Sequence, residues 1–249
     1  MRHIFLSPHF DDAIGSCGGT IARLVRDGAD VIVCTLFGGE GQAPFSDFAA
    51  SLHRQWRLGE NAVAERRRED AEAATTIGCR AEWLPYLEAI YRTGADGKPL
   101  YARGADLFAG VNAADSDLAG RIGETLRGRL DLADRIYGPA AFGDHADHQI
   151  AFAAGQALRS AGLHVQFYRE FFYAEKADSA TRLSGLDLVD APFGPVEFAL
   201  KCAAVVCYRS QIRWLFGSEG AMHLHFENTN RRDSEMGYAE IFWRDPAST

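Results

Sequence analysis

Short runs of apolar and β-branched residues alternate along the chain with longer segments in which apolar positions recur at a helical spacing. The short runs predict strands at residues 3–7, 31–37, 81–84, 135–137, 165–174 and 239–243. The longer segments predict helices at residues 15–27, 62–77, 117–130, 147–160 and 195–216. This alternation is typical of a sheet with helices on both faces. We therefore expect an α/β fold, a Rossmann-like three-layer αβα sandwich with a mostly parallel sheet.

No linker rich in Pro, Ser or Gly divides the chain, so we expect residues 1–249 to form a single domain. Two segments, residues 38–61 and 88–115, are long, contain glycine and aromatic residues, and show no clear period. Loops of this length in a compact domain are often functional. Because ligands bind at the carboxyl ends of the strands in an open parallel sheet, the loops after the first three predicted strands should line one pocket.

Charge and composition narrow the classes of partner. The 249 residues are 47% hydrophobic and include 26 Lys and Arg against 34 Asp and Glu, a net charge of −8. Such a field repels polyanions, so nucleic acid is not an expected partner. The sequence shows no signal peptide and no run of the ~18 apolar residues that a membrane helix needs, so we expect a cytoplasmic protein without a membrane span. None of the five cysteines belongs to a Cys-x-x-Cys pair, so their spacing does not fit a zinc ribbon. We therefore expect any metal to be bound by histidine and carboxylate side chains.

One imidazole and two adjacent carboxylates follow the first predicted strand, in the motif Pro8-His9-Phe10-Asp11-Asp12. Neighbouring carboxylates repel each other unless a cation or a proton lies between them, which favours a metal ion. The alternative is that one of the two aspartates only caps the following helix. A cap leaves His9 and the second carboxylate without a role.

A second polar motif, His145-Ala146-Asp147-His148, follows the strand predicted at residues 135–137 and opens a helix. It therefore also lies at the carboxyl end of a strand. His9, Asp12 and His148 together would make a site of two imidazoles and one carboxylate, which is the ligand count of a catalytic zinc with an open position for water.

The two motifs resemble the signatures Pro-His-x-Asp-Asp and His-x-Asp-His of the zinc-dependent N-acetylglucosaminyl deacetylases related to PIG-L and LmbE. The resemblance extends over nearly the whole chain. Further matching segments are Cys17-Gly18-Gly19, Arg66-Arg67-Arg68-Glu69-Asp70, Ile77-Gly78, Phe167-Tyr168, Phe172-Tyr173-Ala174, Lys201 and Tyr208-Arg209-Ser210-Gln211. Departures from the family pattern are Ala13 in place of a frequent Glu, and Phe10 and Ala146 in place of prolines.

The resemblance implies a role for each motif residue. His9, Asp12 and His148 would bind Zn²⁺, and Asp11 would be the general base. His145, in its protonated form, would stabilise or protonate the reacting group, and Asp147 would orient His145. Ferrous iron is an alternative metal under reducing conditions.

Three further features are open to two interpretations. Arg66 would bind substrate in the family, whereas its acidic neighbours otherwise suggest a salt-bridged helix face. His223 and His225 alternate as on a strand face, and we expect them to be structural or rim residues rather than a second metal site. Aromatic residues near the long loops, such as Trp56 and Tyr91, suit the binding of a sugar ring.

These observations predict zinc-dependent hydrolysis of an N-acyl group, with acetyl the first candidate, from an amino sugar or small glycoconjugate. The alternatives are a metal-dependent hydrolase of another amide or of an ester, and a catalytically silent relative that binds glycans. The expected partner is a small molecule, and the sequence leaves a homo-oligomer open. Aminoglycosides, glycopeptide sugars, thiol-precursor conjugates and lipid-linked glycans would all fit.

Overall fold

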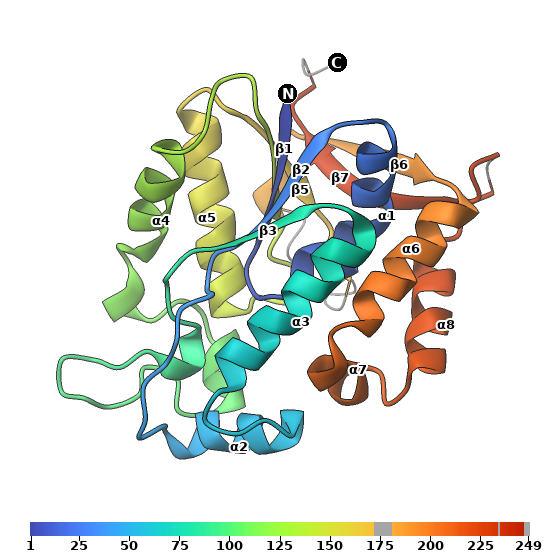
Figure 1. Cartoon of the computed structure of the whole chain (residues 1–249). Coiled ribbons are helices and arrows are strands. Elements are labelled where there is room, and N and C mark those ends of the chain that lie inside the picture. Colours follow the sequence, from blue (N-terminus) through green and yellow to red (C-terminus); the bar gives the residue numbers. More distant parts are fainter. Residues whose placement is uncertain (172–180, 234, 247–249) are drawn as a thin grey trace.

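A computed structural model describes residues 1–171, 181–233 and 235–246 of the chain (Figure 1). Its sheet has seven strands in the order β3-β2-β1-β4-β5-β7-β6. Their bounds are β1 Arg2–Ser7, β2 Asp30–Thr35, β3 Arg80–Trp83, β4 Arg135–Pro139, β5 His164–Tyr168, β6 Asp187–Phe193 and β7 Tyr238–Arg244. The first five strands are parallel, and β7 runs antiparallel to both β5 and β6. The prediction of a mostly parallel α/β fold is confirmed.

Helices cover both faces of this sheet (Figure 1). Their bounds are α1 Asp12–Arg26, α2 Asp47–Trp56, α3 Ala62–Ile77, α4 Leu118–Arg127, α5 Ala146–Ser160, α6 Pro195–Val206, α7 Arg209–Leu215 and α8 Glu219–Asn230. α1, α3 and α6 pack on one face, and α4 and α5 on the other. Successive side chains of β1 point to opposite faces of the sheet. Phe5 packs in the apolar core under α1, α3 and α6, and Leu6 packs in the core under α4 and α5. No helix in the described ranges is long and apolar enough to cross a membrane.

The long segment at residues 38–61, predicted as a loop, contains the helix α2. Ser46 caps this helix, because its hydroxyl accepts a hydrogen bond from the backbone N–H of Ala49 at 3.1 Å. It buries only Ala49, His53 and Trp56, and its ten residues are too few for the sequence pattern to separate them from the surrounding loop. The second long segment, residues 88–115, holds only three short 3-10 helices: η1 Ala89–Tyr91, η2 Gly104–Phe108 and η3 Ala113–Asp115.

The C-terminal part differs most from the prediction. The single helix expected at residues 195–216 is two helices, α6 and α7, with a break next to Tyr208. The Tyr208 hydroxyl donates a hydrogen bond to Asp70 Oδ1 at 2.7 Å, and this buried contact fixes the turn. β6 and α8 were not predicted at all. The strand expected at residues 165–174 ends at Tyr168, and residues 172–174 lie outside the described part.

Small residues in α1 allow its close contact with the C-terminal elements. A Cβ atom on Gly18 would lie 2.7 Å from Lys201 Cγ, and one on Gly19 would overlap the ring of Phe193. The matching Cys17-Gly18-Gly19 segment is therefore explained by packing. Lys201 itself is buried and forms an ion pair with Glu240 Oε1 at 2.7 Å.

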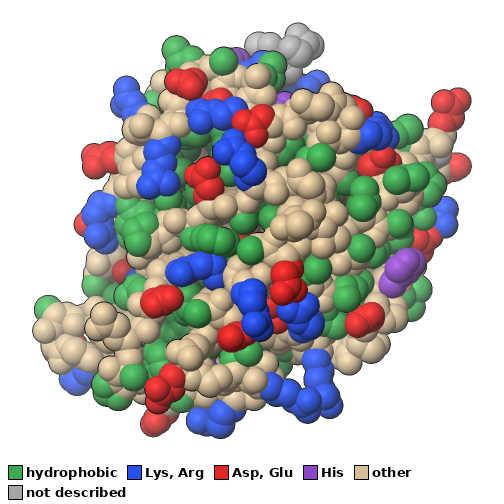
Figure 2. Space-filling view, in the orientation of Figure 1, with side chains coloured by type: hydrophobic (Ala, Val, Ile, Leu, Met, Phe, Trp, Pro, Cys, Tyr) green, Lys and Arg blue, Asp and Glu red, His purple; other side chains and the backbone are tan. Residues whose placement is uncertain are grey.

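The exposed charges are of both signs. Figure 2 shows Lys and Arg side chains interspersed with Asp and Glu over the face in view, with no continuous band of either sign.

Candidate metal centre and active site

The two polar motifs meet because β1 and β4 are adjacent parallel strands. Their carboxyl ends lie at the same edge of the sheet. His9 lies in the turn after β1, and Asp12 is the first residue of α1. His145 is the N-cap of α5, and His148 lies in its first turn.

His9, Asp12 and His148 place three donor atoms close together. Asp12 Oδ2 lies 3.2 Å from His9 Nδ1 and 3.3 Å from His148 Nε2. Two ligands bound at 2.0–2.2 Å to a tetrahedral cation are about 3.3–3.5 Å apart, so this set fits a metal ion such as zinc. His145 also lies near, because ligand atoms of His9, His145 and His148 are within 4.8 Å of one another.

The other nitrogen of each of these two histidines contacts a carboxylate. His9 Nε2 lies 3.0 Å from Asp147 Oδ2, and His148 Nδ1 lies 3.2 Å from Glu170 Oε1. A histidine that binds a metal through one nitrogen and a carboxylate through the other is the usual arrangement in metalloproteins. Glu170 was missed by the sequence analysis, because it belongs to no motif and only its place after β5 gives a signal.

The carboxylates of Asp12 and Glu170 stabilise positive charge at the site. Burial favours the neutral ring of His148, yet Asp12 and Glu170 raise its pKa to about 9. A metal cation in the place of these protons would satisfy the same charges.

The capping alternative for the first motif is contradicted for Asp11, whose side chain makes no cap hydrogen bond. Its carboxylate instead lies 3.7 Å from Arg66 Nη2. Burial and the neighbouring Asp12 raise the pKa of Asp11 to about 6, and Arg66 limits this rise. Asp11 is therefore ionised at neutral pH and close to the point at which it takes up a proton.

Arg66 is only 4% exposed and is not part of a solvated helix face. Its Nη1 donates a hydrogen bond to Glu88 Oε1 at 2.5 Å. The guanidinium lies between the rings of Phe10 and Trp56, at 5.1 and 4.7 Å from their centroids. Glu88 was also missed by the sequence analysis.

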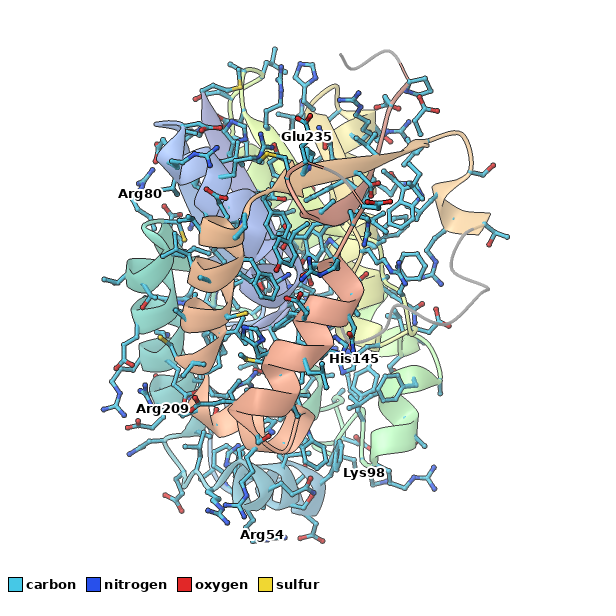
Figure 3. All side chains as sticks on the ribbon, turned by 90° about the vertical axis from the view of Figure 1, so that its right-hand side faces the viewer. Arg54, Arg80, Lys98, His145, Arg209 and Glu235 are labelled. Atoms are coloured by element: carbon cyan, nitrogen blue, oxygen red, sulfur yellow. The ribbon has the colours of Figure 1, made fainter. Side chains whose placement is uncertain are left out.

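His145 differs from its expected state. Its Nδ1 accepts a hydrogen bond from the backbone N–H of Asp147 at 3.2 Å, which leaves the proton of the neutral ring on Nε2. Burial lowers the pKa of His145 to about 3. In Figure 3 its side chain lies inside the molecule, whereas Arg54 and Lys98 extend from the edge. This environment favours the neutral form of His145, whereas the resemblance led us to expect the protonated form.

Asp147 also differs from the expectation. Its backbone N–H contacts the ring of His145, but its carboxylate is directed to His9, to the N–H of Ala89 at 2.9 Å, and to Arg92. The carboxylate therefore orients His9 rather than His145.

A cavity of about 330 Å³ lies above these groups. Its polar residues are His9, Asp11, Asp12, Arg66, Glu88, His145, Asp147, Gln55 and Gln211. Its apolar wall comes mainly from α2, η2 and α7 and comprises Phe48, Leu52, Trp56, Ile90, Leu107, Phe108, Phe171, Trp214 and Leu215. Trp214 and Phe108 are 51% and 42% exposed, so apolar surface continues to the rim.

Other candidates lie away from this cavity. Tyr91 binds His53 Nε2 at 2.7 Å instead of lining it. His223 and His225 lie on the helix α8, not on a strand. Two residues apart on a helix, they are rotated by about 200° and cannot share a ligand easily. His223 packs against the ring of Phe198, and His225 Nε2 contacts the carbonyl of Phe171.

Comparison with known proteins places this site in a family. Residues 4–158 match the family described as PIG-L, GlcNAc-PI de-N-acetylase. The 2'-N-acetylparomamine deacetylase of Niallia circulans is 32% identical over 99% of this chain and 91% of its own length. The enzyme of the same name from Streptomyces fradiae is 30% identical, over 88% of this chain and 73% of its own.

Two solved structures are similar along their full length. A complex of the deacetylase from the teicoplanin biosynthesis pathway has a TM-score of 0.85 and 29% identity, with 100% of both chains covered. A zinc-inhibited form of a teicoplanin deacetylase has a TM-score of 0.82 and 28% identity, again with full coverage. The chain therefore belongs to the PIG-L family and is a hydrolytic N-deacetylase.

Proposed function

We propose that this protein is a zinc-dependent deacetylase that removes the N-acetyl group of an amino sugar carrying an apolar aglycone. The observation that carries the reaction is the meeting of the donor atoms of His9, Asp12 and His148, with His9, Asp12 and Asp11 lining one cavity. Two imidazoles and one carboxylate favour zinc over magnesium, which prefers oxygen ligands.

When bound at His9, Asp12 and His148, zinc would lower the pKa of a water molecule and polarise the amide carbonyl. Asp11 accepts a proton from the attacking water as the new C–O bond forms. The same carboxyl then gives the proton to the nitrogen as the C–N bond breaks, so that acetate and an amine leave. Its pKa of about 6 suits both steps.

His145 is proposed to act as a neutral hydrogen-bond donor. Because Nδ1 already accepts from Asp147, the Nε2 proton is the one that can face the developing negative charge on the carbonyl oxygen. Arg66 is proposed to hold Asp11 and Glu88 in place and to bind a substrate oxygen at the cavity wall.

The rim of the cavity supports the choice of substrate. Its acidic residues lie at the floor with Arg66, and its outer wall of Leu52, Phe108, Trp214 and Leu215 carries no charge. Burial of an apolar aglycone there is favourable by about 25 cal/mol per Å². The ammonium groups of an aminoglycoside would lose water against these four side chains, which offer no acceptor. The rim therefore favours a substrate of the glycopeptide kind over one like N-acetylparomamine.

The test is amine release from free N-acetylglucosamine, its aryl and alkyl glycosides, and an N-acetylated aminoglycoside, with chelator and after zinc is restored. We expect kcat/KM at least tenfold higher for the apolar glycosides than for the free sugar, and loss of activity with chelator. Equal values for all sugars would contradict the aglycone assignment. Hydrolysis of simple amides or esters alone would favour a metal-dependent hydrolase of other substrates. No turnover of any compound would favour a catalytically silent relative that binds glycans.

A further inference from the structure

Arg92 lies behind the metal centre and is only 7% exposed. Its Nη2 forms an ion pair with Asp147 Oδ1 at 2.7 Å, and its Nε forms another with Asp115 Oδ2 at 3.0 Å. Its Nη1 donates a hydrogen bond to the carbonyl of Leu87 at 3.2 Å. The guanidinium thus meets three oxygens at once, through two ion pairs and one hydrogen bond.

Asp147, which is fully buried, divides its two oxygens between Arg92 and the metal centre. Oδ1 contacts Arg92, and Oδ2 contacts His9 Nε2 at 3.0 Å and the N–H of Ala89 at 2.9 Å. A buried carboxylate without a cation beside it would be strongly destabilised. Arg92 supplies that cation at Oδ1, while Oδ2 faces His9.

Arg92 also contacts residues on the side away from Asp147, namely Asp115, Phe37 and Tyr101. Asp115 Oδ2 accepts a hydrogen bond from the Tyr101 hydroxyl at 2.8 Å. The guanidinium lies over the rings of Phe37 and Tyr101, at 5.3 and 5.2 Å from their centroids. Arg92, Tyr101 and Asp115 all come from the long segment at residues 88–115, so this segment builds a support under the metal centre.

We propose that Arg92 is a positioning residue for the metal ligand His9, acting through the Asp147 carboxylate. With Asp147 Oδ2 held at His9 Nε2, the proton of the neutral ring stays on Nε2, and the lone pair of Nδ1 is directed toward Asp12 and His148. This inference rests on the metal assignment made for the proposed function. Loss of such a partner typically weakens metal binding about 10–100-fold.

The experiment compares Arg92→Met, which removes the charge, with Arg92→Lys, which keeps the charge and loses the planar fork. Arg67→Met is the matched control, because Arg67 also lies over a ring, that of Trp83, but forms its ion pair with Glu40 and not with Asp147. The readouts are the zinc dissociation constant, measured by competition with a chromophoric chelator, and the visible spectrum of the Co²⁺-substituted protein.

We expect zinc binding to weaken 10–100-fold in Arg92→Met, less in Arg92→Lys, and less than twofold in Arg67→Met, with a changed Co²⁺ spectrum only in the Arg92 variants. Urea unfolding of the metal-free proteins separates this effect from a loss of fold, and Arg92→Lys is measured alone if Arg92→Met does not fold. Zinc affinity within threefold of wild type and an unchanged spectrum in the folded Arg92 variants would overturn the inference, whatever the activity. Wild-type protein that binds no metal would overturn it too. A wild type that binds metal but hydrolyses no sugar would contradict only the proposed function.

Discussion

Two neighbours shift the pKa of Asp11 in opposite directions. Burial and Asp12 make its ionised form less stable, and Arg66 makes it more stable. Asp11→Asn keeps the shape of the side chain but cannot take up a proton. We expect this variant to bind zinc like the wild type and to lose about 10²–10⁴-fold in kcat. Metal analysis and turnover of the same preparation check this, and near-normal hydrolysis would remove Asp11 from the role of base.

The pH dependence of activity should separate Asp11 from His145. As pH falls through about 6, Asp11 becomes protonated and activity declines; a bound cation would shift this limb to lower pH. Burial lowers the pKa of His145 to about 3, so we expect this residue to stay neutral over the whole range.

His145→Ala should therefore reduce kcat by about 10²–10³-fold, as loss of an oxyanion donor does, without altering the shape of either limb. His145→Gln is the control that restores a donor. A pH–rate profile of each variant is the measurement. Disappearance of the alkaline limb in His145→Ala would show that a protonated His145 is required after all.

At the scale of single residues, the sequence predicted those site residues that belong to one of the two motifs. His9, Asp12 and His148 come together because two neighbouring strands end at one edge. Glu170 and Arg92 are separated from their partners by many residues and match no motif, so only the fold brings them to the site. The roles of all these residues stay predictions until tested.

At the scale of elements, α1 is held to the C-terminal part by its glycines. Gly19→Ala places a methyl group on the fully buried ring of Phe193, and overpacking of this kind costs about 1–3 kcal/mol. Gly120→Ala in α4 is the matched control, because a Cβ there meets nothing within 4 Å. It should stabilise the protein by up to about 1 kcal/mol. Urea unfolding of both variants decides, and equal stabilities would contradict this account of the motif.

The elements that the sequence predicted well are those of the regular β-α pattern. β1 and β2 follow from their continuous apolar runs and α3 from its many helix-forming Ala, Glu and Arg residues, and all three form as expected. At the break between α6 and α7, Tyr208 forms a hydrogen bond with Asp70, which lies far away in the sequence, so local periodicity gives no signal for this contact. β6 contains Asp187, Asp190 and Pro192 without a regular alternation, so its propensity for a strand is weak.

At the scale of the whole molecule, Asp70 joins three parts of the fold. It accepts hydrogen bonds from Tyr208 at 2.7 Å, Trp83 at 2.8 Å and Thr35 at 3.4 Å. Burial nevertheless raises its pKa to about 7, whereas an unfolded Asp has a pKa of about 3.9. The folded protein thus keeps a proton that the unfolded chain releases between these values. This stabilisation is complete below about pH 4 and is lost as pH rises through about 7.

Asp70→Asn cannot ionise, so its free energy of unfolding should lack this decline. We expect the difference between wild type and variant to shift in favour of the variant from pH 5 to pH 8 in urea unfolding. Asp30→Asn, which removes an exposed carboxylate paired with Arg80, controls for surface charge. If the curves of wild type and Asp70→Asn stay parallel, Asp70 is ionised in the folded protein at both pH values.

The order of the strands also has a consequence for biosynthesis. β7 lies between β5 and β6, so β6 leaves the ribosome before the only described strand that pairs with it. Until β7 has been synthesised, β5 has an unpaired edge, and unpaired edges invite contact with other chains. We therefore expect the nascent protein to depend on chaperones until β7 has been synthesised, and premature termination before residue 238 should yield aggregates rather than a smaller enzyme.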